Sequence, residues 1–416
     1  MKQFLAALLG CMLLAGCASP APSPWPEEPM RGVAAAGGEQ DLVLLMSADL
    51  HYQPQPSESA SALIPQVAYI GELLDCLVQE TLTARPAALL LCGDLTNNGR
   101  LEEHQGLLEL LAPLRAGGLP VYLLPGNHDL GPTTPEQFAR LYADYGYSQA
   151  LLRDESSLSY LVALDDQTWL LMLDSASAVG AGPEGGFAPA TLAWTEGVLA
   201  QARAEDKILL TASHHPLLGH SSQDYNGKEK FFGSQEMAAL LQGYRQPFHL
   251  AGHLHKQHLA TRQGETPFTE LTDGMLADYP HVYTRLNLSP ATRQLDYQAV
   301  YLDVDGWAAA NGLTQSPFPA FLDFSQTSRR QGSRKIIQGM LDTMEIPAGH
   351  KRQLADFFTQ TSLAGGAGMD AQTLASQPGY ALWQQYRGQD TRYSRWMDYL
   401  LEQARANNRT LTVTLP

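Results

Sequence analysis

The sequence is poor in cysteine and in positive charge. Only 4 of its 416 residues are Cys, and 27 Lys and Arg stand against 43 Asp and Glu, which gives a formal net charge of -16 at pH 7. This balance argues against binding to nucleic acid through a broad basic surface. Hydrophobic residues make up 44% of the chain and charged residues 17%. That composition excludes a mostly disordered protein, a collagen and a coiled coil.

The sequence also lacks an apolar run of about 18 residues, the length that a membrane-spanning helix needs. The N-terminal stretch from Phe4 to Leu14 is shorter; it follows Lys2 and ends in Leu14-Ala15-Gly16-Cys17. This pattern resembles the bacterial lipoprotein signal, in which the Cys becomes the lipidated first residue. We therefore expect a signal peptide over residues 1–16. The exported protein would be held at the cell membrane or outer membrane by lipid on Cys17. An ordinary cleaved signal is the alternative.

Residues 17–40 are expected to form an extended tether, because residues 18–40 contain five prolines among Ala, Gly and Ser. If Cys11 leaves with the signal and Cys17 carries lipid, two cysteines remain, Cys76 and Cys92. They could pair in an exported protein. Because Cys76 sits in a helical pattern and Cys92 in an apolar run, we favour two buried thiols.

From residue 41 onward, short apolar runs alternate with helical spacing. The apolar runs predict strands at 42–46, 88–91, 121–124, 208–211 and 248–250, and a hairpin formed by 158–164 and 169–173. Helices are expected at 63–77, 101–114 and 189–204. Strand-helix-strand repeats of this length indicate a parallel sheet with helices outside it. The hairpin makes the sheet system mixed.

Polar side chains follow five of these strands. They are Asp49-Leu50-His51, Gly93-Asp94, Gly126-Asn127-His128-Asp129, His214-His215-Pro216 and Gly252-His253-Leu254-His255. Ligand sites of open α/β sheets lie beyond the carboxyl ends of the strands, so we expect these blocks to converge. Asp-x-His and His-x-His also put two side chains on one face of an extended segment.

The five blocks offer three Asp, one Asn and six His, with no thiolate except Cys92. Imidazole and carboxylate together suit Zn, Mn, Fe or Ni. The set is larger than one tetrahedral ion needs, and two metals that share a bridging carboxylate account for the number.

In order and spacing, the five blocks resemble those of the calcineurin-like metallophosphoesterase family. Gly93-Asp94-Leu95-Thr96, followed by Gly99 and Glu102, is most similar to its cyclic-nucleotide phosphodiesterase branch. The resemblance covers residues 41–300 and implies a four-layer α/β/β/α sandwich. It implies two divalent metal ions (Mn, Fe, Zn or a mixture). Asp49, His51 and His255 would bind the first ion, Asn127, His214 and His253 the second, and Asp94 would bridge them.

The family resemblance also implies an activity. A hydroxide shared by the two metals would attack a phosphodiester, or less favourably a phosphomonoester. His128 would protonate the leaving group, and Asp129 would orient His128. The role of His215 stays open between support of the ligands and packing. The rival interpretation is a metal-containing surface binding protein or adhesin without significant catalysis.

The resemblance ends near residue 300. We expect a catalytic domain over 41–305 and a small helical appendage over 306–416, with an irregular stretch at 307–319 and helical segments at 334–344, 351–359 and 392–405. A basic cluster falls on this appendage, at Arg329, Arg330, Arg334 and Lys335. Such a cluster is either a solvated face or a contact for anionic lipid or wall polymer.

Overall fold

The computed structural model describes residues 41–54, 64–177, 185–221, 231–364, 371–389 and 392–416. The expected signal peptide and tether lie outside these residues. Within the described ranges, no helix is both long enough and apolar enough to cross a membrane.

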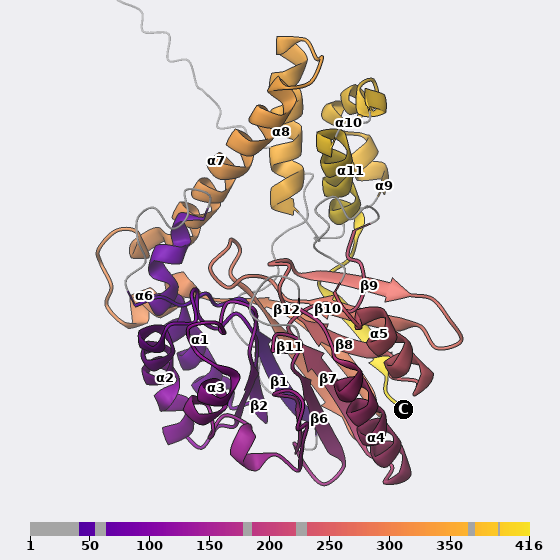
Figure 1. Ribbon diagram of the computed structural model, residues 1–416. Helices are drawn as coiled ribbons and strands as arrows, with labels where there is room; N and C mark the ends of the chain where they lie inside the picture. Colours follow the sequence, from indigo (N-terminus) through magenta and orange to yellow (C-terminus); the bar gives the residue numbers. More distant parts are fainter. Residues whose placement is uncertain (1–40, 55–63, 178–184, 222–230, 365–370, 390–391) are drawn as a thin grey trace, which may run out of the picture.

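Two mixed β-sheets pack face to face, and helices cover their outer faces (Figure 1). Helices α1, α2 and α3 flank the first sheet, while α4 and α5 flank the second. The predicted α/β/β/α sandwich is therefore confirmed. The helices that cover the sheets are α1 (Ile70–Ala84), α2 (Leu101–Ala116), α3 (Pro135–Leu141), α4 (Pro189–Ala204) and α5 (Ser234–Gly243).

The first sheet has six strands in the order β13-β12-β11-β1-β2-β3. Strands β1, β2 and β3 are parallel, with β3 at the edge, whereas β11, β12 and β13 join by antiparallel pairing. The strands are β1 (Leu42–Ser47), β2 (Ala88–Cys92), β3 (Val121–Leu124), β11 (Val282–Ser289), β12 (Gln294–Tyr301) and β13 (Thr410–Thr414).

The second sheet has seven strands in the order β4-β5-β6-β7-β8-β10-β9. Strands β6, β7, β8 and β10 run parallel, and β5 pairs with β6 as the predicted antiparallel hairpin. The strands are β4 (Leu152–Arg153), β5 (Tyr160–Ala163), β6 (Thr168–Leu173), β7 (Ile208–Ser213), β8 (Phe248–Ala251), β9 (His258–Arg262) and β10 (Phe268–Thr272).

Strand β6 shows why the apolar runs become central strands. Alternate side chains point to opposite faces of a strand. Leu170 and Met172 pack into the core between the two sheets, whereas Trp169, Leu171 and Leu173 pack toward α4 and α5. Both faces are buried, so the strand is apolar throughout and shows no polar alternation. Cys76 and Cys92 are buried free thiols, as predicted.

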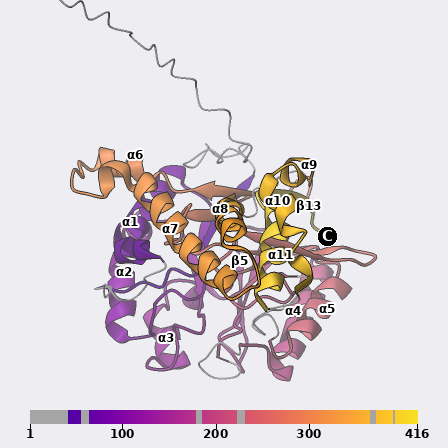
Figure 2. The same ribbon diagram turned by 90° about the horizontal axis from the view of Figure 1, so that it is seen from above.

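The C-terminal helices form a separate layer above the carboxyl ends of the strands (Figures 1 and 2). Among the described residues, an apolar cluster around Phe358 and Trp383 packs their helices together. This layer contains α7 (Phe321–Asp342), α8 (Ala348–Ala364), α9 (Ala371–Ala375), α10 (Pro378–Trp383) and α11 (Arg392–Arg405). In this article these five helices are called the helical region.

Two features of the C-terminal part differ from the sequence-based expectation. Helix α6 (Val304–Ala310) covers the start of the stretch that was expected to be irregular, and the side chain of Asp303 before it accepts a hydrogen bond from the Gly306 N–H. The segment expected to be an all-helical appendage ends in β13, which pairs with β12 in the first sheet. The helical region is therefore an insertion between two parts of the sandwich.

Candidate metal centre

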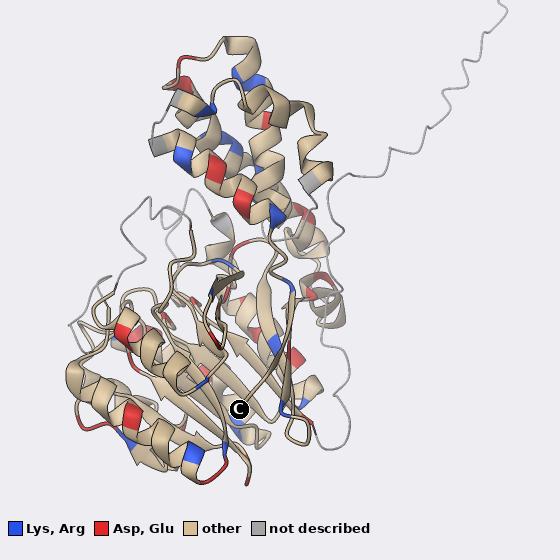
Figure 3. Ribbon diagram, turned by 90° about the vertical axis from the view of Figure 1, so that its right-hand side faces the viewer, with Lys and Arg blue, Asp and Glu red and all other residues tan. Residues whose placement is uncertain are grey.

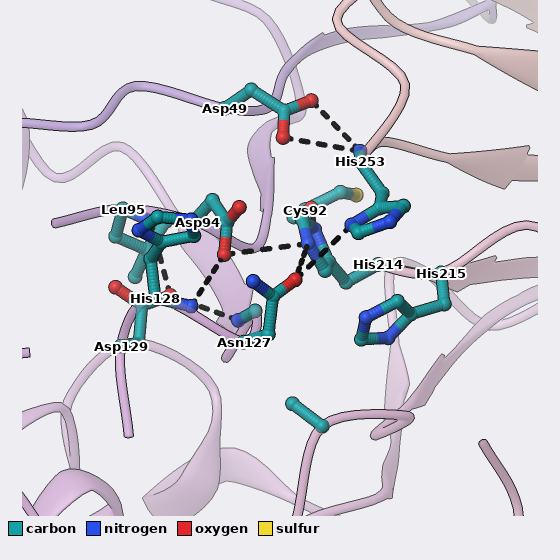
Figure 4. Close-up of polar contacts among 12 residues, drawn as sticks. Asp49, Cys92, Asp94, Leu95, Asn127, His128, Asp129, His214, His215 and His253 are labelled. Carbon is teal, nitrogen blue, oxygen red and sulfur yellow. Dashed lines mark hydrogen bonds and ion pairs between the residues drawn. The ribbon is translucent and has the colours of Figure 1, made fainter. Parts of the chain in front are cut away.

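All five polar blocks lie at the carboxyl ends of strands β1, β2, β3, β7 and β8. The structure brings the seven predicted ligands together there, although His51 and His255 are 204 positions apart. Figure 4 shows Asp94, Asn127, His214 and His253 turned toward one another, with the Asp49 carboxylate beside the backbone of His253.

The segments that leave the strands remain hydrogen-bonded to one another beyond the sheets. After β1, the N–H groups of Asp49 and His51 donate to the carbonyls of Gly93 and Asp94, which follow β2. After β8, the Gly252 N–H donates to the carbonyl of His214, which follows β7. These bonds hold the ligand-bearing segments side by side within each sheet.

Five of the seven predicted ligands have left-handed backbone conformations. Asp49, His51, Asp94, His253 and His255 have φ angles between 47° and 70°. Such angles are uncommon for residues other than Gly, and they persist only where the surrounding structure enforces them. The side chains of Asp-x-His and His-x-His therefore do not converge by the alternation of an extended strand, as the sequence suggested. They converge because the backbone turns sharply at each ligand.

A first group of ligand atoms comes from Asp49, His51, Asp94 and His255, all within 4.8 Å of one another. The Nε2 atoms of His51 and His255 are 3.1 Å apart. The His255 Nε2 is also 3.5 Å from an Asp49 oxygen. Asp49 is fully buried, and both of its oxygens accept a hydrogen bond from the His253 N–H. Two imidazole nitrogens that face each other beside carboxylates form a suitable pocket for a cation.

A second group adjoins it and is built on His214 and His253. The Nε2 of His214 and the Nδ1 of His253 lie 3.2 and 3.1 Å from the Asn127 Oδ1. The Nδ1 of His214 donates to the Cys92 carbonyl at 3.0 Å. This bond assigns the Nδ1 proton and turns Nε2 toward the oxygens of Asn127 and Asp94, the orientation that a metal-binding histidine needs.

Asp94 stands between the two groups. One of its oxygens is 3.7 Å from the His51 Nε2, and the other is 3.3 Å from the His214 Nε2. The second oxygen also accepts the His128 N–H at 2.8 Å. Because its two oxygens face the two groups, Asp94 has the placement that a bridging carboxylate needs.

Two glycines allow this close approach. An added Cβ at Gly126 would lie 2.2 Å from both the backbone N and Oδ1 of Asp94. At Gly93, which has a φ of +81°, a Cβ would lie 2.5 Å from the ring of His214. A larger residue at either position would displace a ligand.

Burial dominates the electrostatics of the first group. It lowers the pKa of His255 to about 4 and the pKa of His51 well below its ordinary value. Both rings are therefore neutral near pH 7, as a metal ligand must be. Burial likewise raises the pKa of Asp49. For Asp94, burial raises the pKa, but the neighbouring histidines, chiefly His214, outweigh it and hold the pKa well below its usual range.

The structure corrects the role expected for Asp129. Its buried carboxylate accepts the N–H groups of Leu95, Thr96 and Gly126 at 3.0, 2.7 and 2.8 Å. It thus joins the segments after β2 and β3 and does not orient the His128 ring. That ring is exposed, and its Nδ1 donates to the Asn97 carbonyl at 2.7 Å. The hydrogen bond leaves Nε2 available on the solvent side.

His215 is more closely involved than the sequence revealed. One ring nitrogen from each of His214, His215 and His253 lies within 4.8 Å of the other two. Ser175 accepts its backbone N–H and contacts Nδ1, both at 3.0 Å. The buried Nε2 has no hydrogen-bond partner among the described residues. His215 is therefore a further candidate ligand or a direct support of the second group.

A buried polar network, which the sequence-based reasoning missed, supports the segment after β7. Glu270 on β10 accepts the N–H groups of Leu217 and Leu218 at 2.7 and 2.8 Å. His220 contacts Glu270 at 3.0 Å and His258 at 2.8 Å, so these two histidines support a loop and are outside both ligand groups. Glu270 lies between Thr269 and Leu271 in the buried strand Phe268–Thr272, and an ionisable residue at that position was the signal that could have revealed this network.

The donors fit divalent transition metals. Imidazole nitrogens and carboxylate or amide oxygens, without a thiolate, suit Zn, Mn or Fe. The remaining thiol nearby, Cys92, is buried, and burial raises its pKa well above the ordinary value. Two adjacent groups with a carboxylate between them can hold two ions. Such a pair can activate water and neutralise phosphate oxygens.

Comparison with known proteins agrees with this geometry. The profile of the family "Calcineurin-like phosphoesterase" matches residues 43–257. The protein named glycerophosphodiester phosphodiesterase GpdQ of Enterobacter lignolyticus is 36% identical over 146 residues, which cover 34% of this chain and 47% of that protein. The "Probable cyclic nucleotide phosphodiesterase RPA0124" of Rhodopseudomonas palustris is 32% identical over 130 residues, which cover 31% of this chain and 42% of that protein.

The aligned parts thus span less than half the length of these two relatives. Among solved structures, a dimetal phosphatase from Danio rerio aligns with 62% of this chain and 96% of its own, at 15% identity and a TM-score of 0.49. The family profile covers more than half of the chain and includes all seven predicted ligands. The chain belongs to the calcineurin-like phosphoesterase family.

Proposed function

We propose that the protein is a metal-dependent phosphodiesterase. The observation that supports this most directly is the position of Asp94 between two groups of ligand atoms. Asp49, His51 and His255 would hold one divalent ion, Asn127, His214 and His253 the other, and Asp94 both. When bound, two such ions supply an activated water and positive charge for the phosphate oxygens.

The residues of the chain have distinct tasks in this proposal. The Nδ1 bond to Asn97 holds the His128 ring, so that a protonated Nε2 can donate its proton to the leaving oxygen. Proton donation of this kind contributes about 10²- to 10⁴-fold to a rate. Asp129 keeps the segments after β2 and β3 in register, which fixes the backbone of Asn127 and His128.

A phosphodiester is favoured over a monoester as the substrate. The two relatives are named as phosphodiesterases, one for glycerophosphodiesters and one for cyclic nucleotides. These names indicate a reaction class and leave the natural substrate open, because the aligned parts are short.

The activity is tested with bis(p-nitrophenyl) phosphate and Mn²⁺, with and without a chelator. We expect metal-dependent release of p-nitrophenol. Asp94→Asn should lose at least one metal, as measured by plasma emission, together with nearly all turnover. Asp154→Asn is the matched control: Asp154 is also a buried carboxylate, bonded to Ser157 and Thr191, but lies outside both ligand groups. Full metal content and a normal rate in Asp94→Asn would refute the bridging role. Absence of turnover by the metal-loaded wild type would favour the binding-protein alternative.

The proposal includes anchoring at the cell surface through lipid on Cys17, which follows the apolar N-terminal stretch. Cys17→Ser should then release the protein from the membrane fraction. If the variant still sediments with membranes after a high-salt wash, lipid on Cys17 is not the anchor.

A further inference from the structure

A cavity of about 340 Å³ lies between the helical region and the metal centre. Its size falls in the range of small-molecule binding sites. His255, a candidate ligand, forms part of the wall, as do the segment 274–282 of the sandwich and helices α7, α8 and α11. In Figures 1 and 2 these helices stand above the carboxyl ends of the strands. A molecule whose phosphate lies at the metal centre could therefore extend into this cavity.

The cavity wall carries positive charge although the protein as a whole is acidic. Lys256, Arg329, Arg330 and Arg409 line it, and Asp278 is the one carboxylate among the described lining residues. Arg329 pairs with Asp278 at 3.1 Å, so this carboxylate is already compensated. Figure 3 shows both basic and acidic residues along the helical region, so the excess of positive charge belongs to the cavity lining. An excess of cations beside a phosphate-processing centre favours an additional anionic group over a neutral or cationic one.

The basic cluster seen in the sequence is thereby divided in two. Arg329 and Arg330 face the cavity, whereas Arg334 pairs with Asp356 on α8 and, like Lys335, is outside the lining. The lining also provides hydrogen-bonding side chains from Gln360 and Gln403. Apart from His255, Lys256 and Gln257, the lining residues lie beyond the part of the chain that matches the family profile.

A direct contact links the helical region to the metal-binding segment. Lys256, the residue after His255, donates to the Tyr399 hydroxyl on α11, and its ammonium lies 4.3 Å from the centre of the Tyr399 ring. The helical region is thus held against the segment that bears a candidate ligand. This contact helps to fix the position of the cavity wall relative to the metal centre.

We infer that the cavity is a specificity site for a second phosphate group, carried by the substrate beyond the phosphodiester that is cleaved. The inference rests on the proposed function and names its substrate class. Arg330 on α7 binds the second phosphate, because a guanidinium donates two parallel hydrogen bonds to phosphate oxygens. The helical region therefore selects the substrate, while the sandwich carries out the reaction.

The test uses two matched substrates, the p-nitrophenyl ester of thymidine 5′-phosphate with and without a 3′-phosphate. Bis(p-nitrophenyl) phosphate reports the reaction on a substrate that has neither the nucleoside nor the second phosphate. In p-nitrophenyl phosphorylcholine, a cation stands in place of the second anion. The wild type should have the highest kcat/KM on the 3′-phosphorylated ester and the lowest on the choline ester.

Arg330→Gln should lower kcat/KM on the 3′-phosphorylated ester by about 10- to 100-fold, the contribution expected of a charge-assisted hydrogen bond. Bis(p-nitrophenyl) phosphate should be unaffected, and Arg330→Lys should restore part of the loss. Lys335→Gln is the control, because it removes the same charge from the same helix outside the cavity. An equal loss on all substrates, or an unchanged ratio between the two thymidine esters, would overturn the inference.

A binding measurement distinguishes failure of the proposed function from failure of the cavity site. If the wild type hydrolyses no diester, calorimetry with thymidine 3′,5′-bisphosphate decides the matter. Binding that weakens in Arg330→Gln and not in Lys335→Gln would support the cavity site without the phosphodiesterase. Equal binding to wild type and to Arg330→Gln would overturn the cavity site as well.

Discussion

The sandwich and the helical region fill their interiors with different chemistry. Between Leu42 and Tyr301, the sandwich buries carboxylates and imidazoles, among them Asp49, Asp94 and His214. Within the described part of 321–405, the buried polar side chains are uncharged hydroxyls and one amide, and the core is apolar around Phe358 and Trp383. Burying a charge costs free energy unless the charge is paired and hydrogen-bonded, whereas burying a methyl group is favourable.

This difference shows that the sandwich needs specific long-range hydrogen bonds to hold its interior. Its buried groups are held by bonds between segments far apart in sequence, such as His214 to Cys92 and Glu270 to Leu217. The left-handed ligand residues add strain of about 1–3 kcal/mol each, which the surrounding packing must offset. Among its described residues, the helical region has no left-handed residue other than Gly and no buried charge that the packing must offset.

The largest effect is expected from Gly126→Ala, which attacks the polar interior of the sandwich directly. The new Cβ would lie 2.2 Å from Asp94, so the carboxylate must move away from both ligand groups. Metal content by plasma emission should fall, and hydrolysis of bis(p-nitrophenyl) phosphate should be nearly abolished, because both groups of ligand atoms lose the carboxylate between them. Gly197→Ala is the control, because a Cβ there, on α4, meets nothing within 4 Å. A fully metal-loaded, active Gly126→Ala protein would show that the tight contact is not needed.

Much of the sandwich could be predicted because its central strands are apolar runs. Strand β3 and helix α4 match their expected bounds, and β1, β2, β6, β7 and β8 lie within two residues of theirs. Strands β9 to β12 gave no such signal. In β11, Thr284 and Arg285 are buried although they are polar, because they sit between partner strands that supply bonds and packing. The pairing of β13 with β12 depends on a partner more than 100 residues away, which no local pattern encodes.

The sequence could predict which residues form the candidate site, but it could not predict their geometry. Its seven candidate ligands follow strands that end at one edge, which is why the sequence could gather them. Their left-handed backbone could not be read from Asp-x-His, since the pattern fits an extended strand equally well. The bonds of Asp129 to three backbone N–H groups were hidden for the same reason, because backbone donors leave no trace in side-chain motifs.

The next largest effect is expected on the rate of hydrolysis when the exposed His128 of the sandwich is replaced. If His128 is the general acid, His128→Ala should keep both metals and lower the rate on alkyl phosphodiesters by about 10²- to 10⁴-fold. A p-nitrophenyl ester should lose much less, because its leaving group has a low pKa and departs without a proton. Rates are compared at matched metal content. Equal losses on both substrates, in step with metal loss, would mean that His128 only packs near the centre.

Trp383→Ala tests whether the helical region stands on its own core. Trp383 is fully buried, packs edge-on against Phe358 and donates to Asp398. Its truncation should cost about 3–5 kcal/mol of the stability of this region. Limited proteolysis should then cut within 321–405 while metal content is retained. Leu171→Ala, in the outer core of the sandwich, is the counterpart and should leave the helical region resistant. Metal loss in Trp383→Ala would show that the two interiors depend on each other.

The smallest effect concerns the acid sensitivity of the buried polar interior. Burial lowers the pKa of His249 from 6.5 to about 4, although Glu270 beside it works in the opposite direction. Its ring is held between the hydroxyls of Thr211 and Ser213 at 2.8 and 2.9 Å. Between pH 6.5 and pH 4 the unfolded chain therefore binds a proton that the folded chain does not. Taken alone, this group lowers the free energy of unfolding as the pH falls through this window, by up to ~1.4 kcal/mol per pH unit. Glu270, whose pKa burial raises to about 7, acts in the opposite direction.

His249→Gln removes that dependence, so the stability difference between variant and wild type should shift in favour of the variant as the pH falls from 6.5 to 4. Urea unfolding of both chelator-treated proteins, followed by tryptophan fluorescence across this range, measures the difference. Phe268→Leu is the control, because Phe268 stacks against His249 and its truncation should lower stability by a similar amount at every pH. If the His249→Gln and wild-type curves stay parallel, the imidazole is not the source of the acid sensitivity. The loss of stability at low pH would then have to come from other buried groups of the sandwich, such as the candidate ligands themselves.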